Sequence, residues 1–165
     1  MKRPEHRPFK VLESEYLSRR PWFTVRRERV LLPTGAIVPE WYIFEFPDWV
    51  NVIAITRDGE FVLIDQYRHG LGQTRYELVA GCCEQGETAE QSARRELLEE
   101  TGYGGGEWQL FMTTSANPTN HNNLVYTSLQ PMSSLCKSLT PRRVRILMCI
   151  YSHAMRCANC SPPTR

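Results

Sequence analysis

Three glutamates stand within five consecutive positions of the chain: Glu96, Glu99 and Glu100. On a helix, residues three and four apart share one face, so Glu96 would lie beside both of the others. Carboxylates this close repel one another unless a cation holds them, and the neighbouring Arg94 and Arg95 are too few and too mobile to neutralise a shared set of oxygens. A divalent hard cation does so better, because Mg²⁺ prefers carboxylate and water oxygens and also binds phosphate groups. The spacing therefore predicts a metal site that takes a phosphate-bearing substrate.

The residues around the glutamates predict the helix that carries them. Thr88, followed three positions later by Gln91, has the form of a capping box at a helix start. Gly102 suits the left-handed position at a helix end. Three apolar residues spaced four apart would dock this helix on a core: Ala89, Ala93 and Leu97. The alternative is a solvated amphipathic helix whose charges only cover its outer face; the full pattern from Gly81 to Gly102 favours the metal site.

That pattern resembles the Nudix box over residues 81–103. Gly81 is followed after five residues by Glu87, and after seven more by Arg95-Glu96-Leu97; Glu99-Glu100 and Gly102 complete the box. Tyr103 stands where an aliphatic residue is usual. A match at this many specified positions is a specific signal. The resemblance implies an α/β fold, namely a Nudix-type α/β/α sandwich with a mixed sheet, and magnesium-dependent hydrolysis of a nucleoside diphosphate linked to another group.

Two flanking segments resemble the ADP-ribose (ADP-sugar) pyrophosphatase branch of that family. One is Gln66-Tyr67-Arg68, and the other is the run of residues 76–81, Tyr-Glu-Leu-Val-Ala-Gly, in which Val79 replaces the usual proline. The resemblance implies that the Ala80 carbonyl joins Glu96 and Glu100 as a metal ligand. It also implies that Arg68 reaches a substrate phosphate, with Glu77 beside it in the substrate-binding set. A buried salt bridge is the alternative role for Arg68 and Glu77.

The glutamates and one arginine divide the expected catalytic work. Glu96 and Glu100 are the first-choice ligands of Mg²⁺, with Mn²⁺ as the alternative metal. Glu99 is either a third ligand or the carboxylate that orients the attacking water, since bound metal needs a positioned water for hydrolysis. Arg95, one turn before Glu99, can pair with it and fix its rotamer. Glu87 is expected to brace the loop ahead of the helix. Histidine titrates near neutral pH, so two further acid–base candidates remain: His69 and His121.

The chain divides into three expected regions: an N-terminal β region (1–46), a Nudix catalytic domain (47–130) and an atypical C-terminal tail (131–165). Residues 24–32 and 37–46 are rich in β-branched and aromatic residues around a Pro-Thr-Gly turn, which predicts two antiparallel strands. In the ADP-sugar branch such strands pair with a second subunit, so the resemblance implies a homodimer; the alternative is that they fold back on their own domain. Three tryptophans are expected to pack or to line an interface, with stacking on an adenine as the alternative: Trp22, Trp41 and Trp49.

The tail lacks the chemistry that the branch leads us to expect. In that branch a further glutamate on a late loop helps to activate the water, but this chain has no carboxylate side chain after Glu107. Either Glu99 takes the role of base or catalysis is impaired. Residues 131–165 contain four of the six cysteines and no clear helical pattern, which predicts a tail that is disordered or not native in sequence, such as one translated from a shifted reading frame. A zinc site is the weaker alternative for four of its residues: Cys149, His153, Cys157 and Cys160.

Bulk composition fits a compact single domain. The 165 residues are 41% hydrophobic and 23% charged, and no apolar run approaches the length of a membrane span. The N-terminus lacks the apolar stretch of a signal peptide, so we expect a cytoplasmic protein with reduced thiols and no membrane partner. The net charge is −4 through Glu107 and +6 after it, but the late basic residues are scattered, so nucleic-acid binding is not expected.

Three functions remain open from the sequence. The leading one is hydrolysis of an ADP-sugar, ADP-ribose to AMP and ribose 5-phosphate, with a small-molecule nucleoside diphosphate as substrate. The second is hydrolysis of another nucleotide sugar or of a nucleoside triphosphate by the same box. The third is a ligand-binding module that kept the fold and lost turnover. Loops that determine substrate choice cannot be placed from the sequence, so the residues favour the first function without excluding the others.

Overall fold

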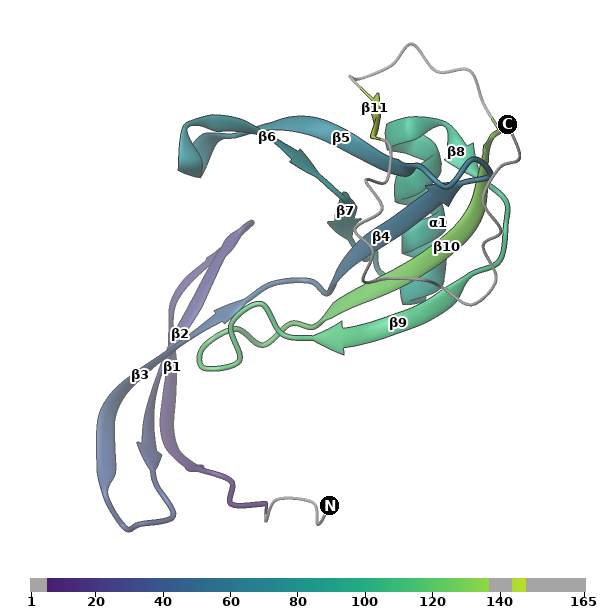
Figure 1. Ribbon diagram of the computed structural model, residues 1–165. Helices are drawn as coiled ribbons and strands as arrows, with labels where there is room; N and C mark the ends of the chain where they lie inside the picture. The colour runs from purple at the N-terminus through teal and green to yellow at the C-terminus, as the bar shows by residue number, and fades with distance from the viewer. Residues whose placement is uncertain (1–5, 137–143, 148–165) are drawn as a thin grey trace, which may run out of the picture.

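The computed structural model describes residues 6–136 and 144–147, which form two β-sheets and one α-helix (Figure 1). The strands of the first sheet are β1 (Lys10–Arg20), β2 (Phe23–Leu31) and β3 (Ile37–Glu45). The second sheet contains β4 (Trp49–Thr56), β5 (Phe61–Arg68), β6 (Gln73–Glu77), β7 (Val79–Cys82), β8 (Tyr103–Gly104), β9 (Gln109–Thr114), β10 (Val125–Leu135) and β11 (Val144–Leu147). A short 3₁₀ turn, η1 (His69–Leu71), links β5 to β6, and the helix α1 (Ala89–Thr101) follows β7.

The N-terminal sheet is antiparallel throughout, in the order β1-β2-β3. It contains one strand more than the two expected. The additional strand, β1, has a mixed sequence of charged, polar and apolar residues whose side chains are nearly all exposed, and it is held by its pairing with β2. The sheet carries ion pairs between neighbouring strands, such as Arg29 with Glu13 at 2.8 Å and Arg27 with Glu40 at 2.9 Å. Cross-strand pairs of opposite charge favour this register over a slipped one.

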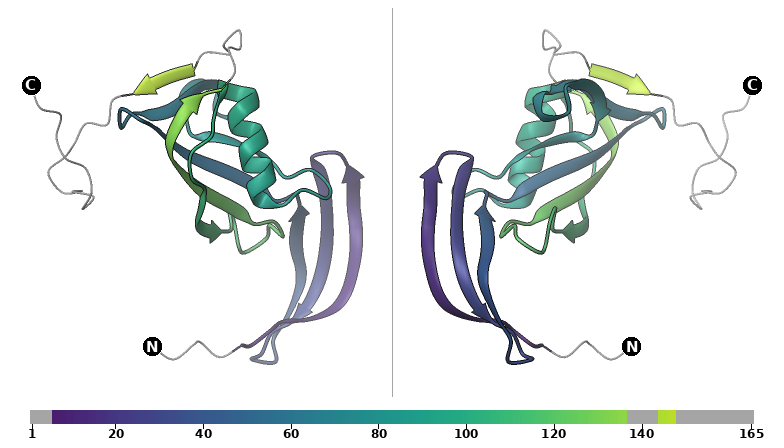
Figure 2. Two further views of the ribbon diagram at one scale, coloured as in Figure 1. Left: turned by 90° about the vertical axis from the view of Figure 1, so that its right-hand side faces the viewer. Right: turned by 90° about the vertical axis from the view of Figure 1, so that its left-hand side faces the viewer.

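The second sheet is mixed, with the path β11-β5-β4-β10-β8. Strand β10 runs parallel to β4, whereas its neighbours β9 and β8 are antiparallel to it. Strand β7 pairs with β4, and β6 pairs with β5 in a hairpin that projects from the sheet (Figure 1). A mixed sheet with a helix on one face, preceded by an antiparallel sheet, confirms the expected fold class (Figure 2).

The core lies between α1 and the central strand β4. Alternate residues of β4 are buried, as one face of the strand turns toward the helix. The expected apolar stripe of α1 packs here: Ala93 and Leu97 are fully buried, and Ala89 is partly buried against the same cluster. The cluster also includes residues of β4, β5 and β7: Val50, Val52, Ala54, Val62, Ile64 and Val79. Helix α1 is therefore held rigidly over β7, the strand that leads into its loop.

Two short strands precede the loop of α1, with Leu78 between them: β6 pairs with β5, and β7 pairs with β4. Strand β10 continues to Leu135, five residues past the expected end of the catalytic domain. The cysteine and histidine residues considered for zinc lie outside the described residues, as does most of the expected tail. Within the described part of the chain, no helix is long and apolar enough to cross a membrane.

Candidate active site

Arg95 forms the centre of the candidate site. Its Nε and Nη2 atoms each lie 3.0 Å from one carboxylate oxygen of Glu87, and Nη2 also donates to the Cys82 carbonyl at 3.1 Å. Its Nη1 lies 2.7 Å from Glu96 Oε1 and 3.4 Å from Glu99 Oε2. Arg95 is therefore tightly held, contrary to the expectation that it would be mobile. A fork of fixed donors, which a lysine lacks, allows one side chain to bind three carboxylates at once.

Glu87 braces the loop ahead of α1, as expected. Besides its paired contact with Arg95, one of its oxygens accepts from the Glu84 backbone N–H at 3.2 Å and from Ser92 Oγ at 2.6 Å. These donors, the Arg95 guanidinium first among them, lower the pKa of Glu87 from 4.5 to about 2. Hydrogen bonds and a cation both favour the charged form of a carboxylate. Glu87 thus stays ionised in the folded protein and holds Arg95 in place.

Ser92 is a positioning residue that the sequence did not single out. It is fully buried on α1, and its hydroxyl reaches back five residues to Glu87. It lies four residues after the cap Thr88 and four before Glu96, on the edge of the apolar stripe rather than within it. A small polar residue at a helical position next to the buried face was the available signal. Its role becomes clear only when the position of the Glu87 carboxylate is known.

The Glu96 carboxylate lies directly against the backbone of Gly81 on β7. A Cβ atom at position 81 would overlap with the Cδ and both oxygens of Glu96. The glycine of the box is therefore needed because a side chain would occupy the space of the carboxylate. The structure thus brings Glu96 next to the strand that carries Ala80, as the predicted ligand set requires. Glu96 and Ala80 supply hard oxygen donors, which suit Mg²⁺ or Mn²⁺.

The two remaining glutamates differ in exposure. Glu99 is 61% exposed, against 15% for Glu96, and Glu100 is half-buried. In the described part of the chain, no three His, Cys, Asp or Glu side chains are gathered closely enough to hold a metal ion. Glu96 and Glu99 each turn one carboxylate oxygen toward Arg95 Nη1, so these oxygens contact the guanidinium rather than a shared metal position. By their spacing the three glutamates share one face of α1, while their assignment as metal ligands stays a prediction.

Arg68 and Glu77 form an ion pair between β5 and β6. Arg68 Nε lies 3.0 and 2.9 Å from the two Glu77 oxygens, and Nη2 lies 2.5 Å from Oε2. The hydrogen bond with Glu77 is the largest cause that raises the pKa of Arg68, and the charge of Glu100 contributes as well. Arg68 is 43% exposed, so the pair is open to solvent rather than buried. This arrangement leaves the guanidinium partly accessible to solvent.

Neither histidine candidate approaches the glutamates through a described contact. His69 is exposed in η1. The ring of His121 packs against Phe44 and Phe46, with centroids 5.9 and 5.1 Å away. His69 is thus a surface residue, and the contacts of His121 favour a packing role.

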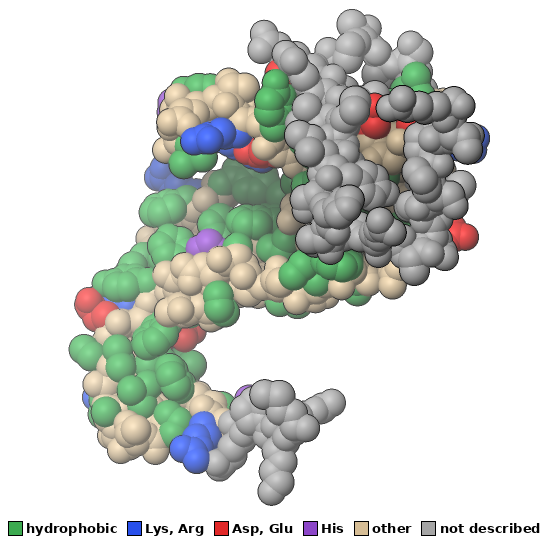
Figure 3. Space-filling view, in the orientation of Figure 1, with side chains coloured by type: hydrophobic (Ala, Val, Ile, Leu, Met, Phe, Trp, Pro, Cys, Tyr) green, Lys and Arg blue, Asp and Glu red, His purple; other side chains and the backbone are tan. Residues whose placement is uncertain are grey.

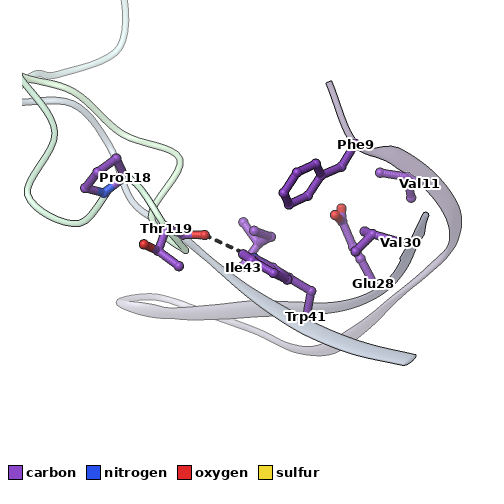
Figure 4. Close-up of a pocket in the computed structure, with 8 residues that line it drawn as sticks. All are labelled: Phe9, Val11, Glu28, Val30, Trp41, Ile43, Pro118 and Thr119. Carbon is purple, nitrogen blue, oxygen red and sulfur yellow. Dashed lines mark hydrogen bonds between the residues drawn. The ribbon is translucent and has the colours of Figure 1, made fainter. Parts of the chain in front are cut away.

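The tryptophans are placed as packing and surface residues. Trp41 Nε1 donates to the Thr119 carbonyl at 3.0 Å, and its ring meets Phe9 edge-to-face. It lines a cavity of about 450 Å³ between the N-terminal sheet and the loop at Pro118 (Figure 4). Trp49 packs against Phe46. Trp22 is 68% exposed at the turn between β1 and β2, with a positive φ of 62°. The adenine-stacking alternative stays untested for all three.

Comparison with known proteins assigns the family. A model of the NUDIX domain matches residues 46–130. The chain belongs to the Nudix family. A second model, the nucleoside diphosphate sugar hydrolase N-terminal domain, matches residues 9–44, which is nearly the whole N-terminal sheet. The described cysteines of this Nudix chain, Cys82, Cys83 and Cys136, are free.

Two relatives of this chain are both named ADP-ribose pyrophosphatase. The one from Mycobacterium tuberculosis (strain ATCC 25618 / H37Rv) is 33% identical over 111 residues, covering 67% of this chain and 53% of the relative. The one from Bacillus subtilis (strain 168) is 42% identical over 76 residues, covering 46% of this chain and 40% of the relative. The chain thus spans about half the length of these relatives. A solved structure described as an ADP compounds hydrolase has a TM-score of 0.73 at 20% identity, covering 88% of this chain and 80% of that one, and supports the Nudix fold.

The Glu87–Arg95 pair predicts a stability difference that depends on pH. Because folding lowers the pKa of Glu87, its contribution is present above about pH 4.5 and is lost as the pH falls toward 2. We expect Glu87→Gln to unfold at lower urea than the wild type at pH 7, with the gap shrinking between pH 4.5 and 2. Urea titrations followed by circular dichroism measure it. The exposed Glu107→Gln serves as the control, and a gap for Glu87→Gln that is constant with pH contradicts the assignment.

Proposed function

We propose that this chain is a magnesium-dependent hydrolase of ADP-sugars that converts ADP-ribose to AMP and ribose 5-phosphate, with Mn²⁺ as an alternative metal. The observation that carries the proposal is the position of Arg95, which joins Glu87, Glu96 and Glu99 in one frame against β7. The names of the relatives from M. tuberculosis and B. subtilis support ADP-ribose as the substrate.

The proposed metal ligands are oxygen atoms of α1 and β7. Glu96, Glu100 and the Ala80 carbonyl would hold the ion, with Glu99 as either a third ligand or the base. When bound, the ion would supply charge neutralisation on the diphosphate and a more acidic water. Gly81 keeps the space next to Glu96 open, and Arg95 limits the rotation of Glu96 and Glu99.

The remaining steps fall to side chains of this chain. Arg68, held by Glu77 through two of its nitrogens, would bind a phosphate oxygen and offset the charge that builds there. Water attacks one phosphorus, the anhydride P–O bond breaks, and the leaving phosphate takes the electron pair. Glu99, the exposed member of the trio, accepts the proton of the water. The sequence supports this choice of base over the role of third ligand, since no carboxylate side chain follows Glu107.

An assay with a panel of substrates tests the proposal. The protein is incubated with Mg²⁺ and, in separate reactions, ADP-ribose, GDP-mannose, UDP-glucose and nucleoside triphosphates, and the products are separated by ion-exchange chromatography. AMP and ribose 5-phosphate formed from ADP-ribose support the proposal. Preferred turnover of another substrate supports the broader Nudix alternative, and binding of ADP-ribose without products supports the module that lost turnover.

We further propose that the chain acts as a homodimer through its N-terminal sheet. Many large hydrophobic side chains of this sheet are exposed: Val11, Leu12, Tyr16, Leu17, Trp22, Phe23, Ile37 and Tyr42. On the face drawn in Figure 3, hydrophobic side chains cover much of this sheet. An exposed apolar area of this kind is unusual on a monomer and typical of an interface. The match of residues 9–44 to an N-terminal domain of nucleoside diphosphate sugar hydrolases supports the same view.

The dimer predicts a change of mass on substitution. We expect the wild type to elute with the mass of two chains and Leu17→Asp, at a position 52% exposed, to elute as one chain, because an aspartate cannot be buried unpaired at an apolar interface. Size-exclusion chromatography with light scattering measures it. Leu71→Asp, at a position 65% exposed but outside the N-terminal sheet, is the matched control. A wild type of single-chain mass at all concentrations contradicts the proposal.

A further inference from the structure

A short linker, residues 46–48, joins β3 to β4 and thereby connects the two sheets along the chain. Within the described residues, the strands of the two sheets make few direct contacts with one another. Residues 117–123, which we name the strap, precede β10 and lie across this junction (Figure 1). The relative position of the two sheets must therefore depend largely on what the strap contacts.

On the side of β3, the strap forms main-chain hydrogen bonds. Phe44 N–H donates to the Asn120 carbonyl at 2.7 Å, and Asn122 N–H donates back to the Phe44 carbonyl at 3.2 Å. Trp41 Nε1 donates to the Thr119 carbonyl at 3.0 Å, which Figure 4 shows at the edge of the cavity. These contacts add a short parallel bridge, at Phe44 and His121, to the end of β3.

On the side of the linker, asparagine side chains bind the main chain. Phe46 N–H donates to Asn122 Oδ1 at 3.0 Å, and Asn123 Nδ2 donates to the Pro47 carbonyl at 3.0 Å. Asp48 Oδ1 accepts from Leu124 N–H at 2.8 Å, next to the strap. Buried main-chain groups need partners, and a loop with no regular ladder must find them in side chains. The strap thus bonds the main chain of the linker at Phe46 and Pro47.

The strap is also preformed as a turn. His121 N–H donates to the Asn117 carbonyl at 2.8 Å, and Thr119 N–H donates to Asn117 Oδ1 at 3.3 Å. Asparagine favours such turns because its side chain can bind the main chain two residues further on. A segment ordered in this way loses less entropy when it docks on a neighbour.

His121 fills the centre of the junction. Its ring packs against Phe44 and Phe46, and its Nδ1 atom is buried without a hydrogen-bond partner among the described residues. The contacts of this ring with the two phenylalanines are therefore aromatic packing contacts rather than hydrogen bonds. Phenylalanine has a similar shape and no nitrogen, so it can replace histidine in such a role.

We propose that the strap fixes the N-terminal sheet relative to the Nudix sheet, and that His121 is the positioning residue at its centre. The strap leads directly into β10, which pairs with β4, and β4 in turn pairs with β7 beside the glutamates. A rigid path of paired strands therefore connects the N-terminal sheet to the candidate active site.

Hydrogen exchange followed by mass spectrometry tests this role on the full chain. His121→Ala is expected to raise exchange in β3 at least about tenfold, since contacts on both sides of the ring are lost, while exchange in the β4 core stays at the wild-type rate. His121→Phe is expected to keep the wild-type rate in both strands. His69→Ala, the same change at an exposed site, is the control and should alter neither strand.

Three results would overturn the proposal: unchanged β3 exchange in His121→Ala, an equal rise in β3 and β4, or rapid β3 exchange in His121→Phe. If His121→Ala does not fold, Asn122→Ala, which removes the acceptor of Phe46 N–H, must give the same selective rise in β3.

A kinetic readout rests on the proposed function: His121→Ala should raise KM for ADP-ribose more than it lowers kcat, and His121→Phe should keep the wild-type KM. Loss of kcat in His121→Phe with normal exchange would assign an acid–base role instead. An inactive wild type would defeat the proposed function and leave the exchange result standing.

Discussion

Glu96→Gln is expected to lower kcat/KM for ADP-ribose by about a hundred- to a thousandfold in saturating Mg²⁺, a loss typical of removing one preorganised charge from a reaction centre. The change keeps the shape of the side chain but removes the charge that lies against Gly81 and faces Arg95 at 2.7 Å. Glutamine offers one carbonyl oxygen in place of two charged ones, so metal affinity should fall as well. Steady-state kinetics and calorimetric titration with Mn²⁺ measure the two effects separately.

Glu90→Gln is the matched control for this change. It lies on the same helix, in the first turn, where its side chain is 58% exposed and pairs with Arg94 at 2.7 Å. An exposed ion pair of this kind contributes little to stability, so the variant should keep wild-type kinetics and metal affinity. Wild-type turnover by Glu96→Gln at saturating metal would contradict the assignment of Glu96. Parallel measurements on Glu99→Gln separate the two roles left open for Glu99, because loss of turnover with unchanged Mn²⁺ affinity identifies a base.

The catalytic helix could be predicted almost completely because its signals are local. Thr88 caps the helix and forms the predicted capping box with Gln91, and Gly102 ends it in the left-handed conformation with φ of 75°. Both ends depend on residues within four positions of the helix, so no knowledge of the rest of the chain was needed.

The contacts of Arg95 and the strap depended on long-range packing that sequence does not reveal. Arg95 was expected to pair with Glu99 because the two lie one turn apart, yet its shorter contacts go to Glu87 and Glu96. Glu87, eight positions away in the loop ahead of α1, makes the closer contact because docking of α1 on the core brings that loop next to the Arg95 guanidinium. The strap residues lie 76 positions from the linker that they bind. Asparagine is typical of turns, but the partner of each of these side chains is set by the tertiary fold.

Gly81→Ala is expected to abolish most turnover while leaving the fold intact. The added Cβ would occupy the space of the Glu96 carboxylate, and the carboxylate is the end of a flexible side chain, so it would move rather than the strand. Displacement from the end of β7 should cost at least about a hundredfold in kcat/KM, because misplacement by an ångström can already cost that much, and should weaken Mn²⁺ binding.

Gly70→Ala is the matched control, since nothing lies within 4 Å of a Cβ at that position and its φ is not positive. The two variants should melt at similar temperatures but differ in turnover. Equal activity in both would show that the carboxylate position at Gly81 is unimportant for hydrolysis, and a collapse of folding in Gly81→Ala would show that the glycine serves the sheet rather than the site.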